Sequence, residues 1–157
     1  MSARPLVGVG AVVFNEKGEI LLVKRIYPPQ EGKWAIPGGH LELEETIFDG
    51  AKRELYEETG LIGDAKCIVN VDELIVLKED KSVWRHYILI DVLFENVRGE
   101  LKAGSDAGDA KFFSPSEAIN SKDTSYSTIN FLKKYINGDI ICGLPVLNKY
   151  IEKIDRI

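Results

Sequence analysis

Six glutamates lie close together in this chain, at spacings that could do chemistry. They occupy the 23 positions from 39 to 61 and are Glu42, Glu44, Glu45, Glu54, Glu57 and Glu58. On a helix, which turns about 100° per residue, the last three project within an arc of about 100° and share one face. Like charges at this spacing repel each other and stabilise a helix poorly without a counterion. The pattern therefore indicates either a solvated acidic face or a site for a positive group.

Divalent cations are the positive groups that suit these carboxylates best. Mg²⁺ prefers oxygen ligands, and proteins usually hold it by one or a few carboxylates together with a substrate's phosphates. Directly before the acidic stretch, Gly38 and Gly39 follow Pro37. Glycine has no side chain in the way, so this backbone can approach a metal or a phosphate closely.

The whole stretch from 39 to 61 resembles the Nudix box, the signature of the Nudix hydrolases. The box reads G-x5-E-x7-R-E-U-x-E-E-x-G-U, where U is aliphatic. All nine specified positions agree here: Gly39, Glu45, Arg53, Glu54, Leu55, Glu57, Glu58, Gly60 and Leu61. Nine constrained positions at fixed intervals rarely coincide by chance. The resemblance covers residues 7–136, and it implies an α+β fold, an α/β/α sandwich with a mixed sheet in which the box forms a loop, a helix and a loop.

The resemblance also implies a reaction, the hydrolysis of a pyrophosphate bond in a nucleoside diphosphate linked to another group. Mg²⁺ or Mn²⁺ would bridge the phosphates and neutralise developing charge. Glu57 and Glu58 would be the principal metal ligands, and the carbonyl of Gly38 or Gly39 a further one. Glu54 would be either a metal ligand or the base that activates water.

Other residues of the box and of a later loop complete the expected catalytic group. Arg53 would orient a neighbouring glutamate through a charge-assisted contact, and Glu45 would support the loop and helix geometry. In some Nudix enzymes the base comes from a loop after the box. The candidates in this chain are Asp106 and Asp109, for which a solvated turn is the alternative.

Phosphate contacts are expected from a strand end and from the glycine turn. Lys24 and Arg25 leave the second strand near the site in this fold, although an ordinary surface pair is an equal alternative. Gly39 offers backbone to a phosphate, and His40 beside it could meet one, with a simple loop role as its alternative. We therefore name Lys24, Arg25, Gly39 and His40 as candidate substrate contacts.

The elements that must position these residues follow from periodicity and turn signals. Residues 7–14 and 19–26 predict a β-hairpin around the turn at 15–18, and 34–36 a short strand ended by 37–39. A helix is expected from 44 or 45 to 59 with Gly60 as its C-terminal cap. Two long strands at 65–78 and 82–95, a strand at 110–113, a helix after Pro115 and a helix over 125–136 complete the core.

Length and composition set the outer limits. The chain has 157 residues, of which 45% are apolar and 29% charged, so we expect one Nudix domain over 1–157 with a core at about 5–136. The extension 137–157 predicts a strand at 140–142 and an amphipathic helix over 147–154, which would either cap the core or join two copies in a homodimer.

Charge and cysteine usage bear on partners and location. The net charge of −5 disfavours nucleic acid and anionic membranes as partners, and no export signal or membrane-spanning stretch is visible, so we expect a cytoplasmic protein. Cys67 and Cys142 are expected to be two thiols in a reducing compartment, with a disulfide between them left open.

The substrate must be inferred from outside the box. ADP-ribose pyrophosphatases commonly carry a proline about 16 residues beyond it, and this chain has none between Pro37 and Pro115. The opening of the box and the start of the chain look like the branch that cleaves nucleoside triphosphates to monophosphates and pyrophosphate. ADP-ribose or a nucleotide sugar is the alternative. A catalytically silent nucleotide-binding domain is less expected because every box glutamate is kept, and removal of a messenger-RNA cap is disfavoured by the acidic charge.

Overall fold

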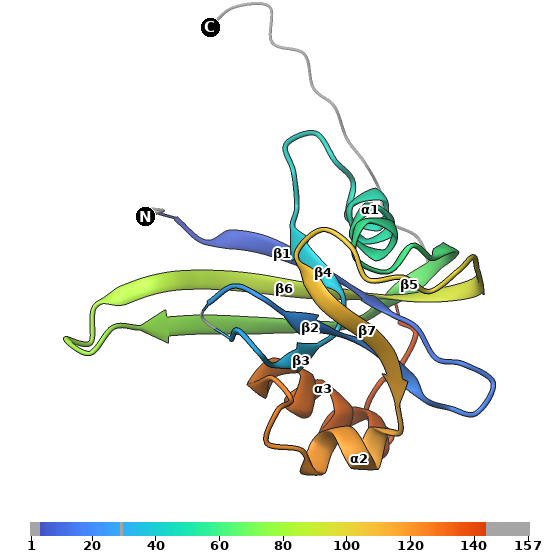
Figure 1. Ribbon diagram of the computed structural model, residues 1–157. Coiled ribbons are helices and arrows are strands. Elements are labelled where there is room, and N and C mark those ends of the chain that lie inside the picture. Colours follow the sequence, from blue (N-terminus) through green and yellow to red (C-terminus); the bar gives the residue numbers. More distant parts are fainter. Residues whose placement is uncertain (1–3, 29, 144–157) are drawn as a thin grey trace, which may run out of the picture.

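The computed structural model describes residues 4–28 and 30–143, and in this part four strands, one helix, three strands and two helices follow one another along the chain (Figure 1). The elements are β1 Leu6–Val12, β2 Ile20–Arg25, β3 Trp34–Ala35, β4 Gly38–His40, α1 Ile47–Thr59, β5 Ile62–Leu77, β6 Val83–Arg98, β7 Ala107–Phe113, α2 Pro115–Asn120 and α3 Tyr126–Ile136.

The strands of the described residues form two sheets. One has four strands in the order β4-β1-β6-β5, and the other has three in the order β3-β2-β7. In the first sheet β1 runs parallel to β6 and antiparallel to β4, while β5 and β6 form a long antiparallel hairpin. The mixed sheet expected from the sequence is therefore confirmed.

Helices cover the strands from opposite sides, with α1 above them and α2 and α3 below them in the view of Figure 1. Two apolar clusters correspond to these layers. Ala51 and Leu55 of α1 belong to the first, and Ala118 of α2 and Phe131 of α3 to the second. This arrangement confirms the α/β/α sandwich. None of the helices in residues 4–28 and 30–143 is long and apolar enough to cross a membrane.

The predicted hairpin of residues 7–14 and 19–26 is wrong. The chain does turn at 15–18, but β1 and β2 enter different sheets and are joined only by a single bridge between Phe14 and Ile20. Both strands are buried along most of their length, as strands inside a sheet are. The two strands nevertheless contribute to the same core, because Val9 and Ala11 of β1 and Leu21 of β2 belong to one apolar cluster.

The glycine turn at 37–39 also differs from the expectation, because Gly38–His40 form the strand β4 beside β1. A β-carbon on Gly38 would collide with the carbonyl oxygen of Val9. Only glycine lets these backbones come so close, and a turn-forming residue type here serves a strand.

The extension agrees only in part with its prediction. No strand forms at 140–142; Ile140 instead packs against the second apolar cluster. The helix predicted over 147–154 lies outside the described residues.

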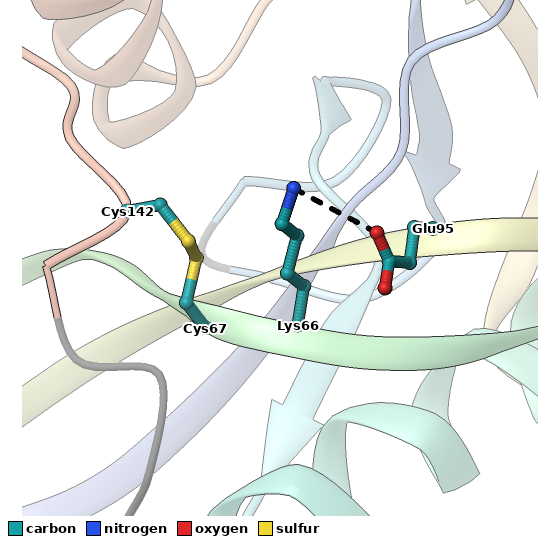
Figure 2. The surroundings of a disulfide bond; sticks show 4 residues. All are labelled: Lys66, Cys67, Glu95 and Cys142. Carbon is teal, nitrogen blue, oxygen red and sulfur yellow. Dashed lines mark ion pairs between the residues drawn. A yellow bond between two sulfur atoms is a disulfide. The ribbon is translucent and has the colours of Figure 1, made fainter.

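The two cysteines correct a further expectation. Cys67 of β5 is joined to Cys142 by a disulfide bond, with 5.6 Å between their α-carbons (Figure 2). Figure 2 also shows the exposed ion pair of Lys66 and Glu95 beside it, 3.7 Å from nitrogen to oxygen. Pairing was possible because β5 carries Cys67 into the second cluster, where the chain after α3 passes. Because the two cysteines are not free thiols, they no longer support the inference that the protein lies in a reducing compartment.

Candidate active site

The helix α1 positions the acidic residues. It begins after Thr46, whose hydroxyl oxygen accepts a hydrogen bond from the N–H of Asp49 at 3.1 Å. It ends at Gly60, which is left-handed with φ of 74°. Because Ala51 and Leu55 are fully buried against the sheet, the helix is fixed about its axis. Its acidic side then faces a cavity of about 620 Å³, lined by Glu54, Glu57 and Glu58.

Arg53 holds three of these acids together. Its Nε donates to Glu45 Oε2 at 2.6 Å and its Nη2 to Glu45 Oε1 at 2.9 Å. Its Nη1 donates to Glu54 Oε1 at 2.8 Å and to Glu57 Oε2 at 3.2 Å, and Nη2 also reaches the carbonyl of His40 at 3.0 Å. The guanidinium lowers the pKa of Glu45 through its hydrogen bonds. Arg53 therefore links the loop before α1 to the acidic side of the helix.

Glu58 is the most enclosed acid of the site, with 6% of its surface exposed. Its Oε1 accepts a hydrogen bond from the N–H of Gly38 at 2.7 Å. Burial raises the pKa of Glu58 to about 8, against the opposing effect of that hydrogen bond, and nearby Glu54 raises it further. Burial likewise raises the pKa of Glu54, while Arg53 lowers it. Ionising these two neighbouring carboxyl groups therefore costs free energy, which a cation beside them would offset.

The donor set fits a divalent cation in its chemistry. Carboxylate oxygens and the backbone of Gly38 and Gly39 are hard ligands of the kind that Mg²⁺ takes. In the described residues, no three acidic, histidine or cysteine side chains are gathered closely enough to hold a metal by themselves. Glu54 and Glu57 accept hydrogen bonds from Arg53, and Glu58 accepts one from Gly38. To bind a metal, these carboxylates must either keep those hydrogen bonds while also coordinating the ion or give them up.

Arg25 brings a positive charge to the same cavity. The β2–β7 register is irregular between Lys24 and Arg25, and this irregularity places Arg25 on the cavity lining while Lys24 is exposed elsewhere. Arg25 Nε is buried and has no hydrogen-bond partner within the described residues. An unpaired buried guanidinium N–H is costly. An anionic oxygen from a ligand is the partner that would satisfy it.

The two loop aspartates are separated by the structure. Asp106 lines the cavity and lies near enough to Glu54 and Glu58 to raise the pKa of both. Asp109 pairs with Lys24 across the β2–β7 ladder and accepts a hydrogen bond from the N–H of Ala110 at 2.8 Å. Neither Asp109 nor Lys24 is among the residues that line the cavity.

Two residues of β4, Gly39 and His40, also lie at the cavity. A β-carbon on Gly39 would meet the carboxyl group of Glu54, so Gly39 gives that acid its room. His40 is exposed at the cavity, with its ring 5.7 Å from that of Tyr87. Both of these predicted residues therefore lie beside the acids.

A polar network on the far strands of the sheet was not predicted. Asp72 of β5 and Asp91 of β6 line the cavity, and Asn70 and Lys134 are bonded to them. The sequence carries one signal, which is that polar residues interrupt otherwise apolar strands at these positions. The pairing of β5 with β6 and the docking of α3 bring them together.

Comparison with known proteins agrees with this geometry. The model of the NUDIX domain matches residues 4–135. An ADP-ribose pyrophosphatase of Methanocaldococcus jannaschii is 38% identical over 69% of this chain and 62% of its own length. An 8-oxo-dGDP phosphatase of Danio rerio is 35% identical over 64% of this chain and 28% of its own length. The chain thus spans less than two thirds of either curated relative.

Solved structures show the same fold. A MutT protein from Methanosarcina mazei superimposes with a TM-score of 0.74 at 22% identity, covering 88% of this chain and 99% of that one. A bifunctional NMN adenylyltransferase/ADP-ribose pyrophosphatase from Francisella tularensis gives 0.63 at 27% identity, covering 91% of this chain and 43% of that one. With its domain match over most of the chain and its complete acidic helix, the protein belongs to the Nudix hydrolase family.

Proposed function

We propose that the protein hydrolyses a pyrophosphate bond of a nucleoside triphosphate, releasing the monophosphate and pyrophosphate, with Mg²⁺ held by Glu54, Glu57, Glu58 and a backbone carbonyl of Gly38 or Gly39. The observation that carries the proposal is that one cavity is lined by side chains of both charges. Three box glutamates line it together with Arg25, whose buried Nε has no partner in the described residues. Acids that require a cation and a guanidinium that requires an anion suit a metal-bound phosphate chain.

Each of these residues has a definite task in the proposed reaction. Arg25 donates to a phosphate oxygen and orients the chain of phosphates. Arg53 keeps Glu54 and Glu57 directed into the cavity. The divalent ion, when bound, neutralises the charge that develops on the phosphates.

The proton of the attacking water goes to Glu54 or to Asp106, both of which line the cavity. If Asp106 is the base, D106N should lower kcat far more than it changes the Mg²⁺ concentration needed for half activity. Unchanged rates in both D106N and D109N assign the role to Glu54. D109N is the comparison variant. If D109N loses rate while D106N does not, Asp109 is the base.

ADP-ribose is the second candidate substrate, and a nucleotide sugar is a variant of it. The observation that favours ADP-ribose is the name of the Methanocaldococcus jannaschii relative, which is 38% identical over 69% of this chain. The missing proline after the box speaks against it. In both substrates the bond between the first and second phosphates is broken. The second phosphate leaves as pyrophosphate from a nucleoside triphosphate and as ribose 5-phosphate from ADP-ribose.

The test is a panel of nucleoside triphosphates, ADP-ribose and nucleotide sugars with Mg²⁺ or Mn²⁺, with products identified by mass. Pyrophosphate and a nucleoside monophosphate support the first proposal, and AMP with ribose 5-phosphate supports the second. Hydrolysis in ¹⁸O-water shows which phosphorus is attacked. No turnover of any member with either metal would contradict an enzymatic function and leave nucleotide binding alone.

A further inference from the structure

The cavity has a second polar region, formed by the ladder of β5 and β6 and remote from α1 in the sequence. Asn70 Nδ2 donates to Asp72 Oδ2 at 2.8 Å and to Asp91 Oδ2 at 3.0 Å. Lys134 of α3 donates to Asn70 Oδ1 at 2.9 Å and to Asp72 Oδ1 at 2.8 Å. The two aspartates line the cavity, whereas Asn70 and Lys134 are not part of its lining.

The network offers the cavity acceptors and no donors. Both N–H bonds of the Asn70 amide are used within it, one for each aspartate. Lys134 neutralises one of the two acids, so the pair keeps a net negative charge. Burial raises the pKa of Asp91 to about 6, which leaves this carboxyl mostly ionised at neutral pH. The cavity wall here can therefore accept hydrogen bonds and repels phosphate.

Glycine in β1 gives Asp91 its place. A β-carbon on Gly10 would come within 2.5 Å of Asp91 Oδ1. Gly10 pairs with Asp91 on one side and with Gly38 on the other. The carboxylate of Asp91 therefore reaches over Gly10, whose partner on the next strand is Gly38, the residue that holds Glu58.

The surface beside the acids is apolar. On β6, Leu89 lies two positions before Asp91 and also lines the cavity. On β5, Leu74 lies two positions after Asp72 and lines it too, with Tyr87 paired to Leu74 across the ladder. A flat ring lying on these side chains would present its edge to the carboxylates. Arg25, which lies close enough to Glu58 to lower its pKa and has an unpaired Nε, would bind the phosphates and so fix the direction in which the ligand lies.

We propose that Asp91, supported by Asp72, accepts a hydrogen bond from the exocyclic amino group of the substrate's base and thereby selects adenine-, guanine- or cytosine-type nucleotides. The proposal rests on the proposed function, because it assigns the base end of the same cavity. Asn70 and Lys134 are positioning residues that act through the two aspartates. A base that lacks the amino group leaves Asp91 without its partner, and a base with an oxo group there sets acceptor against acceptor.

The experiment compares substrates that differ only in the amino group. ATP is paired with purine riboside triphosphate, and GTP with ITP. For the wild-type protein, kcat/KM is expected to be at least about tenfold higher for the amino-bearing member of each pair, which corresponds to about 1.4 kcal/mol. Equal values within both pairs overturn the proposal, whatever any variant does. If ADP-ribose is the substrate, the pair is ADP-ribose and its purine riboside analogue.

The matched variants are D91N and, as control, D64N. The amide introduced by D91N can still accept from Asn70 and then presents N–H groups to the cavity. D91N should therefore lose the preference for the amino-bearing member or reverse it. Asp64 is exposed on the same strand as Asp72 and does not line the cavity, so D64N should keep the wild-type ratio. An equal loss with both members in D91N contradicts base recognition.

The two proposals fail in distinguishable ways. A wild-type protein that hydrolyses no nucleotide refutes the proposed function. A protein that hydrolyses nucleotides without regard to the amino group refutes only the role of Asp91. G10A gives a second variant, since its methyl group displaces Asp91 Oδ1 without changing any charge. It should reduce the same ratio, and an unchanged ratio in G10A counts against the proposal.

Discussion

Glu58 is an almost completely buried carboxyl group, and Gly38 N–H is its hydrogen-bond donor. E58Q keeps an oxygen that can accept this bond and removes the group that could ionise to bind a metal. We expect kcat at saturating Mg²⁺ to fall by on the order of 10²–10⁴ while the thermal midpoint stays the same or rises, because a buried ionised group costs stability.

E57Q should behave alike in kcat, and E73Q is the control, since Glu73 is exposed on β5 and does not line the cavity. Steady-state kinetics and thermal unfolding measure both effects. Near wild-type turnover in E57Q or E58Q would contradict the assignment of these residues as metal ligands.

Gly60 joins two requirements at one position. Its φ is 74°, and a β-carbon there would lie 2.8 Å from the carbonyl oxygen of Glu100. Gly18 has nearly the same φ of 75° with nothing within 4 Å of that position. G18A should therefore lower the free energy of unfolding by about 1 kcal/mol from backbone strain alone, and G60A by distinctly more. Denaturant unfolding of both variants checks the difference, and equal losses would show that the contact with Glu100 has no cost.

At the scale of elements, the disulfide fastens the chain after α3 to the middle of β5. It closes a loop with a sequence separation of 75. Reduction, or the variant C142S, is expected to lower the free energy of unfolding by about 4 kcal/mol and to leave kcat unchanged, because neither cysteine lines the active-site cavity.

Thermal unfolding with and without dithiothreitol measures this contribution. C142S is its own control, since the reductant should shift the wild-type midpoint and not that of the variant. A wild-type midpoint indifferent to reductant would mean that the bond adds nothing to stability in solution.

We expect a divalent cation at the acidic side of α1 to stabilise the whole molecule. Because burial raises the pKa of Glu54 and Glu58, ionising them costs free energy that a bound Mg²⁺ would offset, so Mg²⁺ should raise the thermal midpoint as well as support activity. A concentration of one hundred times Kd corresponds to about 2.7 kcal/mol of added stability. Calorimetry of EDTA-treated protein with Mg²⁺ added back measures it. The effect should shrink in E57Q and E58Q, and a full effect in both variants would place the ion elsewhere.

How far the sequence predicts this molecule depends on the range of the interactions involved. The box residues and the cap at Gly60 were predictable because their spacing lies within one helix and its flanks. The meeting of Asp91 with Asn70 and Lys134 was not, because it needs the strand register of β5 and β6 and the docking of α3. The sequence also did not predict that β1 and β2 lie in different sheets, because a local apolar pattern does not show which strand will be the neighbour.

The position of β1 has a consequence for how the chain acquires its structure. Its parallel partner is β6, and Leu6 pairs with Tyr87, which is 81 positions later in the chain. Pairings over such distances slow folding, because the entropy of closing the loop is lost before the contact forms. During synthesis, β1 leaves the ribosome long before its partner exists. The part of the cavity wall that Gly8 and Gly10 of β1 form is therefore among the last parts of the molecule to be completed, and catalytic activity should appear only with the final steps of folding.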